Sequence, residues 1–415
     1  MVLAGVQTTS GHRLPAYAGF AAMLAAAGLP LYIHAPKFYV DEYGLSLAAL
    51  GSVLFGLRLL DVVQDPLLGK LSEALRNHRS AAVAIGATVL SGAMIGLFAV
   101  TPPLAPLLWF AFMLTLVFSS FSFLTICFYA QGVAKAHELG GSGHLKLARW
   151  RETGALAGVC LAAVAPVALA QITVTPFAGF ALGFVLFALA VVFAMRPEWQ
   201  ASHLPASTGF RAVLQDSPAR RLLIIGLLNA APVAVSSTLF LFFVESRLEA
   251  PGWEGPLLLV FFLSAAIAAP IWGRAAERYG AKQTLIAGMV LSILAFACVL
   301  FLGAGDTAAF AAICIASGAA LGADMTLLPA LFAARMARIA PRAAEGFGLW
   351  SFVTKFTLAF AAVLLLPALE AAGFRAGPEN APEALTLLTL FYAAVPCVLK
   401  AAALVLLAFT TLEDT

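Results

Sequence analysis

The chain has 415 residues, of which 62% are hydrophobic and 11% are charged, with a formal net charge of +3. A typical soluble domain has roughly 45–50% apolar and about 25% charged residues. The composition therefore excludes a soluble globular protein and predicts an all-α integral membrane protein whose main partner is the lipid bilayer. The chain has no basic run, which argues against nucleic acid as a partner.

The first apolar run begins near Leu14 without a preceding basic region and cleavage site, so we expect no removable signal peptide. Five cysteines occur singly in apolar segments, without the spacing of a metal site or a disulfide framework. We interpret them as small buried hydrophobic residues. No resident cofactor or metal is expected.

Twelve apolar runs are long enough to cross a bilayer, since a spanning helix needs about 20 residues. They cover residues 14–36, 45–69, 80–100, 107–134, 148–171, 176–195, 221–246, 256–274, 283–303, 307–333, 345–371 and 386–410. The longest polar interruption follows the sixth run and is rich in proline. We therefore predict two six-helix bundles, residues 1–195 and 221–415, joined by a linker at 196–220.

The distribution of positive charge predicts the orientation. With the amino terminus inside, eighteen lysines and arginines fall in cytoplasmic segments, three fall outside, and Arg58, Lys355 and Lys400 fall within spans. The positive-inside rule then places both termini and the linker in the cytoplasm. We expect a multi-pass protein of the bacterial inner membrane that works as a monomer.

The second run contains three charged residues, Arg58, Asp61 and Asp65, spaced three and four residues apart. At helical pitch these side chains project from one face. Because a charge deep in a bilayer costs roughly 2.5–3.5 kcal/mol, this face is predicted to line an ion or solute pathway. The alternative is an internally neutralised Arg–Asp pair that locks two helices together.

A short pattern follows both the second and the eighth run: a glycine, an acid four residues later, and then bases. The residues are Gly69, Glu73, Arg76 and Arg79 in the first copy, and Gly273, Glu277, Arg278 and Lys282 in the second. Glycine permits close helix approach, and the acid and bases form a polar latch at a tight cytoplasmic turn. Two copies at equivalent places predict an internal repeat and a cytoplasmic gate that opens as the halves rock.

On this pattern the sequence resembles the major facilitator superfamily, whose loop signature is Gly-x-x-x-Asp-Arg-x-Gly-Arg-Lys and which residues 273–282 match with Glu for Asp. The resemblance covers essentially the whole chain. It implies two bundles of inverted three-helix repeats, alternating access, and a substrate site between the bundles near the membrane midplane.

Three segments, near Asp61, Arg151 and Lys355, are similar to the cation-coupled glycoside/melibiose symporter group. The resemblance implies that Asp61 and Asp65 hold a coupling Na⁺ or H⁺, and that Arg151 touches the substrate. It also matches Lys355, which lies about ten residues, or roughly 15 Å, inside the bilayer.

The departures from that group concern acidic residues. Residues 14–35 and 107–131 contain no acid, although sugar-binding members carry one in each of these helices, which weakens the sugar interpretation. Arg335 stands where the group usually has an Asp. Asp324 lies further upstream, and we predict that it faces Lys355, with a purely structural role as the alternative.

Other segments, residues 29–39, 229–238 and 322–329, are similar to a bacterial branch of riboflavin and copper importers. The copper members carry Met pairs in helices seven and eight, where this chain has Val233 with Ser237 and Phe261 with Ala265, so soft ligands for Cu⁺ are missing. For a flavin, the sequence offers three aromatic residues and four hydrogen-bonding residues: Tyr32, Phe240, Trp350, Asn229, Ser236, Ser237 and Thr238. Each has packing between helices as an alternative role.

The sequence thus predicts a secondary transporter that imports a small polar solute. Riboflavin is the first candidate, and a cation-coupled sugar symporter and a copper importer are alternatives. The predicted substrate-binding residues are Arg151, Asn229, Asp324, Trp350 and Lys355. A membrane enzyme is disfavoured because Asp61 and Asp65 have no second Asp-rich cluster. A non-transporting sensor or scaffold is the remaining rival, although it gains nothing by burying charges.

Overall fold

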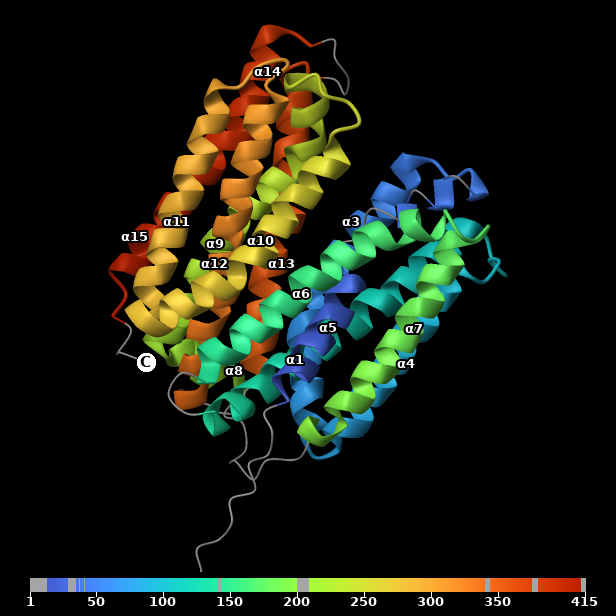
Figure 1. The fold of residues 1–415 in the computed structure, drawn as a ribbon, viewed down its shortest axis with the longest axis vertical. Coiled ribbons are helices and arrows are strands. Elements are labelled where there is room, and N and C mark those ends of the chain that lie inside the picture. Colours follow the sequence, from blue (N-terminus) through green and yellow to red (C-terminus); the bar gives the residue numbers. More distant parts are fainter. Residues whose placement is uncertain are drawn as a thin grey trace, which may run out of the picture.

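The computed structural model describes residues 13–28, 35–36, 38–40, 42–139, 143–199, 209–339, 344–374 and 380–411. Regular secondary structure in these ranges is helical throughout (Figure 1). The first group of membrane helices is α1 (Leu14–Ala26), α3 (Leu47–Ala74), α4 (Arg79–Phe98), α5 (Pro106–Glu138), α6 (Gly143–Leu169) and α7 (Pro176–Met195). We call it the N-terminal half.

The second group, the C-terminal half, follows the segment that contains the short helix α8 (Gly209–Gln215). It comprises α9 (Ser217–Phe242), α10 (Glu254–Tyr279), α11 (Ala281–Cys298), α12 (Thr307–Ile339), α13 (Ala344–Ala371), α14 (Pro382–Thr389) and α15 (Val395–Ala408). A π-helical turn, Phe243–Arg247, extends α9, and another, Leu390–Ala394, joins α14 to α15.

Every predicted span overlaps one of these helices, with α14, the second π turn and α15 together forming the twelfth. Eight of the described helices are long and apolar enough to cross a membrane. Three others, α3, α6 and α13, have 28, 27 and 28 residues, more than the roughly 20 that a bilayer requires. The prediction of an all-α membrane protein is confirmed.

The two halves lie against each other through two pairs of helices. In the first pair α13 of the C-terminal half packs on α3, and in the second α10 packs on α6, which also contacts α12. Figure 1 shows the halves meeting toward the end that holds α8 and the carboxyl terminus. They separate at the opposite end, where α14 lies.

Close packing between helices depends on glycines rather than on a difference in polarity. A Cβ built on Gly154 would lie 2.1 Å from the carbonyl oxygen of Ala18, and one on Gly318 would lie 2.2 Å from that of Phe261. The α1–α6 and α10–α12 pairs therefore pack backbone against backbone. Small residues serve this purpose in membranes, because lipid chains are as apolar as the protein core.

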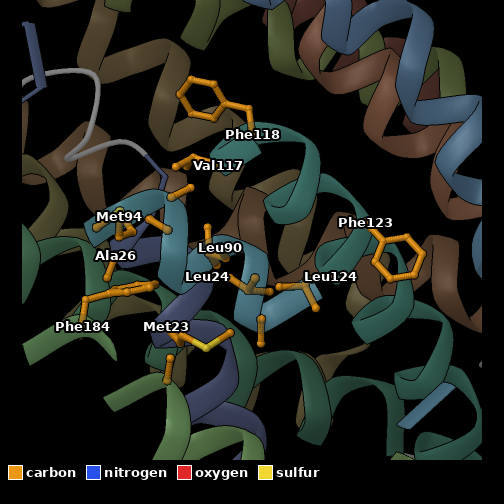
Figure 2. Packing of buried hydrophobic residues seen from close by; sticks show 14 of the residues in the cluster. Met23, Leu24, Ala26, Leu90, Met94, Val117, Phe118, Phe123, Leu124 and Phe184 are labelled. Carbon is orange, nitrogen blue, oxygen red and sulfur yellow. The ribbon is translucent and has the colours of Figure 1, made fainter. Parts of the chain in front are cut away.

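The N-terminal half has a continuous core of large apolar side chains. Figure 2 shows Met23 and Leu24 of α1 beside Leu90 and Met94 of α4 and Leu124 of α5. Equally apolar side chains on the outer faces, such as Val63 and Phe193, are 65% and 76% exposed. The buried and lipid-facing sides thus differ in packing and not in hydrophobicity.

The amino-terminal end of α9 is fixed by a bidentate ion pair. Asp216 accepts a hydrogen bond from the Ala219 amide and caps the helix. Arg335 of α12 donates to both Asp216 oxygens, at 2.9 and 2.5 Å. The pair explains the arginine at position 335, where the sequence resemblance led us to expect an acid.

We expect Gly318→Ala to destabilise the protein by about 1–3 kcal/mol, the usual cost of overpacking, because the new methyl group would press on the Phe261 carbonyl. The measurement is thermal unfolding of the purified protein in detergent. Gly183→Ala is the matched control, since a Cβ there meets nothing within 4 Å. Equal melting temperatures for the two variants would contradict the close α10–α12 packing.

We also expect a pH-dependent effect of Asp216→Asn. Hydrogen bonds from Arg335 hold the pKa of the Asp216 carboxyl below its ordinary value. The pair therefore stabilises the fold above the unfolded pKa of about 3.9, and this contribution is lost as the pH falls through the lower folded pKa. Asparagine retains the helix cap.

The melting temperature of Asp216→Asn should accordingly lie below that of the wild type at pH 7 and converge with it in acid. Glu383→Gln, at an exposed acid of α14, is the control and should show no difference at either pH. A constant deficit of the Asp216 variant at all pH values would argue against the pair.

Candidate functional site between the two halves

The charged face of α3 is turned away from the surface. Asp61 and Asp65 lie one turn apart on this helix and are 1% and 0% exposed. Pro66 follows them inside the helix. The side chain of Arg58 lies outside the described residues, so its pairing with these acids stays a prediction.

The positive partner of both acids comes from the other half of the protein. Lys355 of α13 places its Nζ 3.1 Å from Asp65 Oδ2 and 3.6 Å from Asp61 Oδ2. Its ammonium also contacts the Ser122 hydroxyl of α5. Ser351, one turn before Lys355, donates a 2.7 Å hydrogen bond to Asp65 Oδ2. We call these five residues the interface cluster.

The interface cluster joins residues that the sequence suggested for two different sites. Asp61 and Asp65 were predicted to bind the coupling ion, and Lys355 was predicted to contact substrate. Their proximity follows from a glycine contact: a Cβ on Gly348 would lie 2.9 Å from the Asp65 carbonyl oxygen and 3.2 Å from the Gly69 Cα. Residues 348, 351 and 355 share one face of α13, so this contact directs the lysine at α3.

Gln64, which the sequence did not single out, provides a further hydrogen bond to Asp61. Gln64 donates a 2.8 Å hydrogen bond to Asp61 Oδ1 and accepts one of 2.8 Å from Ser119 of α5. Its position three residues after Asp61 was the available signal, since such residues are neighbours on a helix. With Lys355 on the other oxygen, both oxygens of Asp61 are engaged.

Arg151, predicted to touch substrate, lies at the start of the buried part of α6. Its Nε donates a 2.6 Å hydrogen bond to Glu152, and its guanidinium lies 4.0 Å from the centre of the Tyr129 ring. Nη2 has no hydrogen-bond partner in the described part of the chain. The arrangement neutralises the arginine within the N-terminal half, and its contact with substrate stays a prediction.

The predicted pairing of Asp324 with Lys355 is wrong. Asp324 of α12 instead contacts the ammonium of Lys400 of α15, which also donates a 2.7 Å hydrogen bond to Asn229 of α9. All three are at least 93% buried. The reason is that Lys355 leaves the C-terminal half to reach α3. Lys400 was recognised as an intramembrane lysine, but helix spacing alone could not name its partner.

Trp350 lies on α13 within the C-terminal half. Its ring stacks on Phe332 with centroids 4.8 Å apart, and its six-membered ring would lie about 3.1 Å from a Cβ on Gly226. The side chain is 8% exposed. Its role in contacting substrate stays a prediction, and Tyr32 lies outside the described residues.

The two copies of the gate motif make equivalent contacts at the α8 end. In the first, Gly69 of α3 touches Gly348 of α13. In the second, Gly273 of α10 lies against the Arg149 side chain of α6. Each glycine thus brings together one helix from either half, as a repeat requires.

The charged members of the gate make different contacts in the two copies. Glu277 forms a 3.2 Å ion pair with Arg149 across the halves, whereas Glu73 pairs at 3.1 Å with Arg76, in the 3-10 turn that follows its own helix. The remaining bases bind within their own half: Arg79 donates to Gln131, Arg278 lies over the Tyr279 ring, and Lys282 donates to the Ala408 and Thr410 carbonyls.

The sequence of the chain matches a known protein family. Residues 15–414 match the family described as MFS/sugar transport protein. The chain belongs to this major facilitator family. No curated protein matches it. The family membership confirms the superfamily resemblance at the level of the whole chain.

Solved structures of low identity share the fold. A bacterial homologue of the iron transporter ferroportin, in an outward-facing state, superposes with a TM-score of 0.68 at 14% identity, covering 95% of this chain and 98% of that one. A structure of a bacterial ferroportin homologue with soaked iron has a TM-score of 0.70 at 14% identity, covering 95% of this chain and 99% of that one. A variant of the Escherichia coli fucose:proton symporter gives 0.62 at 13% identity, covering 94% and 98%.

We expect Lys355→Met to lower the free energy of unfolding by about 3 kcal/mol, because it leaves two buried carboxylates without their counter-charge. The effect should be much smaller in the Asp65→Asn background, giving a coupling of about 0.5–3 kcal/mol in a double-mutant cycle. Arg76→Met is the control, since its partly exposed pair with Glu73 is worth under about 1 kcal/mol. Additive losses would show that Lys355 and Asp65 do not interact.

Proposed function

We propose that this chain is a cation-coupled secondary transporter that imports a small polar solute by alternating access. The observation that carries the proposal is the ion pair from Lys355 to Asp61 and Asp65, which is buried and joins the two halves. A scaffold has no need for buried charges at an interface between moving parts. Membership of a transporter family supports the same interpretation.

The packing of the halves corresponds to an outward-facing state in this proposal. The interface cluster, the Gly348–Gly69 contact and the Arg149–Glu277 pair join the halves. Figure 1 shows the halves meeting toward the end that holds α8. This end is cytoplasmic if the positive-inside prediction is correct. Figure 1 shows the halves apart at the other end.

In the proposed mechanism Lys355 acts as a tethered cation that occupies the coupling site. Its ammonium lies among the oxygens of Asp61, Asp65 and Ser122. Carboxylate and hydroxyl oxygens are suitable ligands for Na⁺, and a carboxylate also accepts H⁺. Binding of either ion removes the negative charge that holds Lys355 and weakens the contact between α3 and α13. The halves then separate at the α8 end.

Riboflavin remains our first candidate for the solute, on the resemblance of residues 29–39, 229–238 and 322–329 to riboflavin importers. Sugars are the second candidate class, because the family is described as containing sugar transporters. One structural neighbour is a bacterial homologue of the iron transporter ferroportin, which raises the question of a metal substrate. Among the described residues, no three His, Cys, Asp or Glu side chains lie close enough to hold a metal ion.

The test is uptake of radiolabelled riboflavin by a riboflavin-auxotrophic bacterium that expresses this chain, with copper accumulation followed in parallel. A panel of labelled sugars is then tested with imposed Na⁺ and H⁺ gradients. Saturable uptake of any of these solutes supports a permease. Absence of uptake across the whole panel, with the protein present in the membrane, would favour the sensor or scaffold.

We expect Asp61→Asn to abolish accumulation of the solute against its gradient, down to the passive equilibrium level, because the neutral amide cannot bind the coupling cation. The variant should still be inserted and folded and should still exchange solute across the membrane. The control is Asp306→Asn, at an acid in the turn before α12. Normal concentrative uptake by Asp61→Asn would refute the coupling role.

A further inference from the structure

The C-terminal half contains a second buried charged cluster, separate from the interface cluster. Lys400 of α15 is 3% exposed, Asp324 of α12 is 6% exposed and Asn229 of α9 is 7% exposed. The lysine contacts the acid and donates to the Asn229 side-chain oxygen, so it joins three helices of one half. Buried charges inside a membrane helix bundle are costly and are typical of ion and proton pathways.

Only one of the two carboxylate oxygens of Asp324 has a hydrogen-bond partner among the described residues. Its Oδ2 contacts Lys400, while Oδ1 is buried without a hydrogen-bond partner in the described part of the chain. The Asn229 side chain also interacts favourably with the carboxylate, although no described residue donates a hydrogen bond to Oδ1. An unpaired buried acceptor costs about 1–3 kcal/mol, so an occupant that donates a hydrogen bond is favoured at this atom.

A cavity adjoins the cluster, and Asp324 and Lys400 both contribute to its wall. It has a volume of about 30 Å³ and is lined by residues of α9, α10, α11, α12 and α15, including Asp324 and Lys400. A single water molecule needs roughly 10–15 Å³ measured in this way. The cavity is therefore large enough for one or two water molecules and too small for a sugar or a flavin.

Two of the three serine hydroxyls on the cavity wall, those of Ser236 and Ser317, already donate to backbone carbonyls, and the third belongs to Ser292. Ser236 donates its proton to the Pro232 carbonyl at 3.0 Å, and Ser317 donates to the Ile313 carbonyl at 2.7 Å. Their remaining capacity is as acceptors, which is also true of Asp324 Oδ1. Among the described residues on the wall, the other titratable groups are Lys400 and Cys397 of α15. A permanent metal cation is disfavoured by the adjacent ammonium, which leaves water and the proton that it carries.

We propose that Asp324 is a proton-exchange site within the C-terminal half, supplied through this cavity and distinct from the coupling site at Asp61 and Asp65. A hydronium ion in the cavity transfers its proton to the Asp324 carboxylate and leaves a neutral water molecule. The carboxylate becomes a neutral acid, Lys400 keeps its proton, and the cluster gains one positive charge. The ion pair that joins α12 to α15 is thereby broken.

The position of Asp324 connects this event to the interface between the halves. Leu321, one turn earlier on α12, belongs to the same apolar cluster as Leu156 of α6 in the N-terminal half, and α12 contacts α6. A shift of α12 after the loss of the ion pair would therefore change the packing of α12 against α6. Protonation at Asp324 is a second input to the same rocking motion, independent of the α3–α13 pair.

The test is infrared spectroscopy of the full chain in liposomes, titrated with acid, following the C=O stretching band of protonated carboxyl groups. The wild type should develop a band component as the pH falls that is missing in Asp324→Asn and that shifts on exchange into D₂O. The component should remain in Asp61→Asn, which removes the coupling acid, and in Asp306→Asn, which removes a surface acid. This measurement needs no knowledge of the transported solute.

Lys400→Met provides a second measurement if Asp324→Asn fails to fold. Loss of the ammonium should leave Asp324 protonated at neutral pH. Its C=O band should then be present in Lys400→Met at a pH at which the wild type lacks it. Identical titrations of the wild type and Asp324→Asn would overturn the proposal. So would a Lys400→Met protein without the band at neutral pH, because both results describe a permanent carboxylate whose role is to hold α12 against α15.

Discussion

The ion pair between α13 and α3 is the interaction on which the arrangement of the two halves depends. Lys355 lies within 3.6 Å of two carboxylates that are almost completely buried. In a low-dielectric environment neither the lysine nor the acids can be left alone without a large desolvation cost. Separating the halves at this level would leave the lysine and the two acids without their partners.

This constraint accounts for the small residues around the pair. The ammonium reaches the acids because α3 and α13 approach closely at Gly69 and Gly348. The equivalent approach on the other side of the interface, at Gly273, leaves room for the Arg149 side chain and its bond to Glu277. The first contact is buried and strong, and the second is partly exposed and weak, so the α3–α13 pair dominates the energy of closure.

The C-terminal half repeats the use of a lysine and an acid, but in a different way. Lys400 and Asp324 belong to the same half and neutralise each other there. Breaking this pair does not separate the halves directly, and it acts through the packing of α12 on α6. One charge cluster thus lies at the interface between the halves, and another lies inside the C-terminal half.

The sequence by itself determined the membrane class, the positions of the helices, the repeat of the glycine–acid–base motif and the location of Asp61, Asp65 and Lys355 inside membrane helices. These features follow from composition, run length and spacing along one helix, which are local properties. Partners from different helices depended on the tertiary structure. Lys355 forms its ion pair with Asp65 rather than with Asp324, and Lys400 forms the pair with Asp324. Two lysines in apolar helices look alike in a sequence, and only the packing of the helices decides which acid each one reaches.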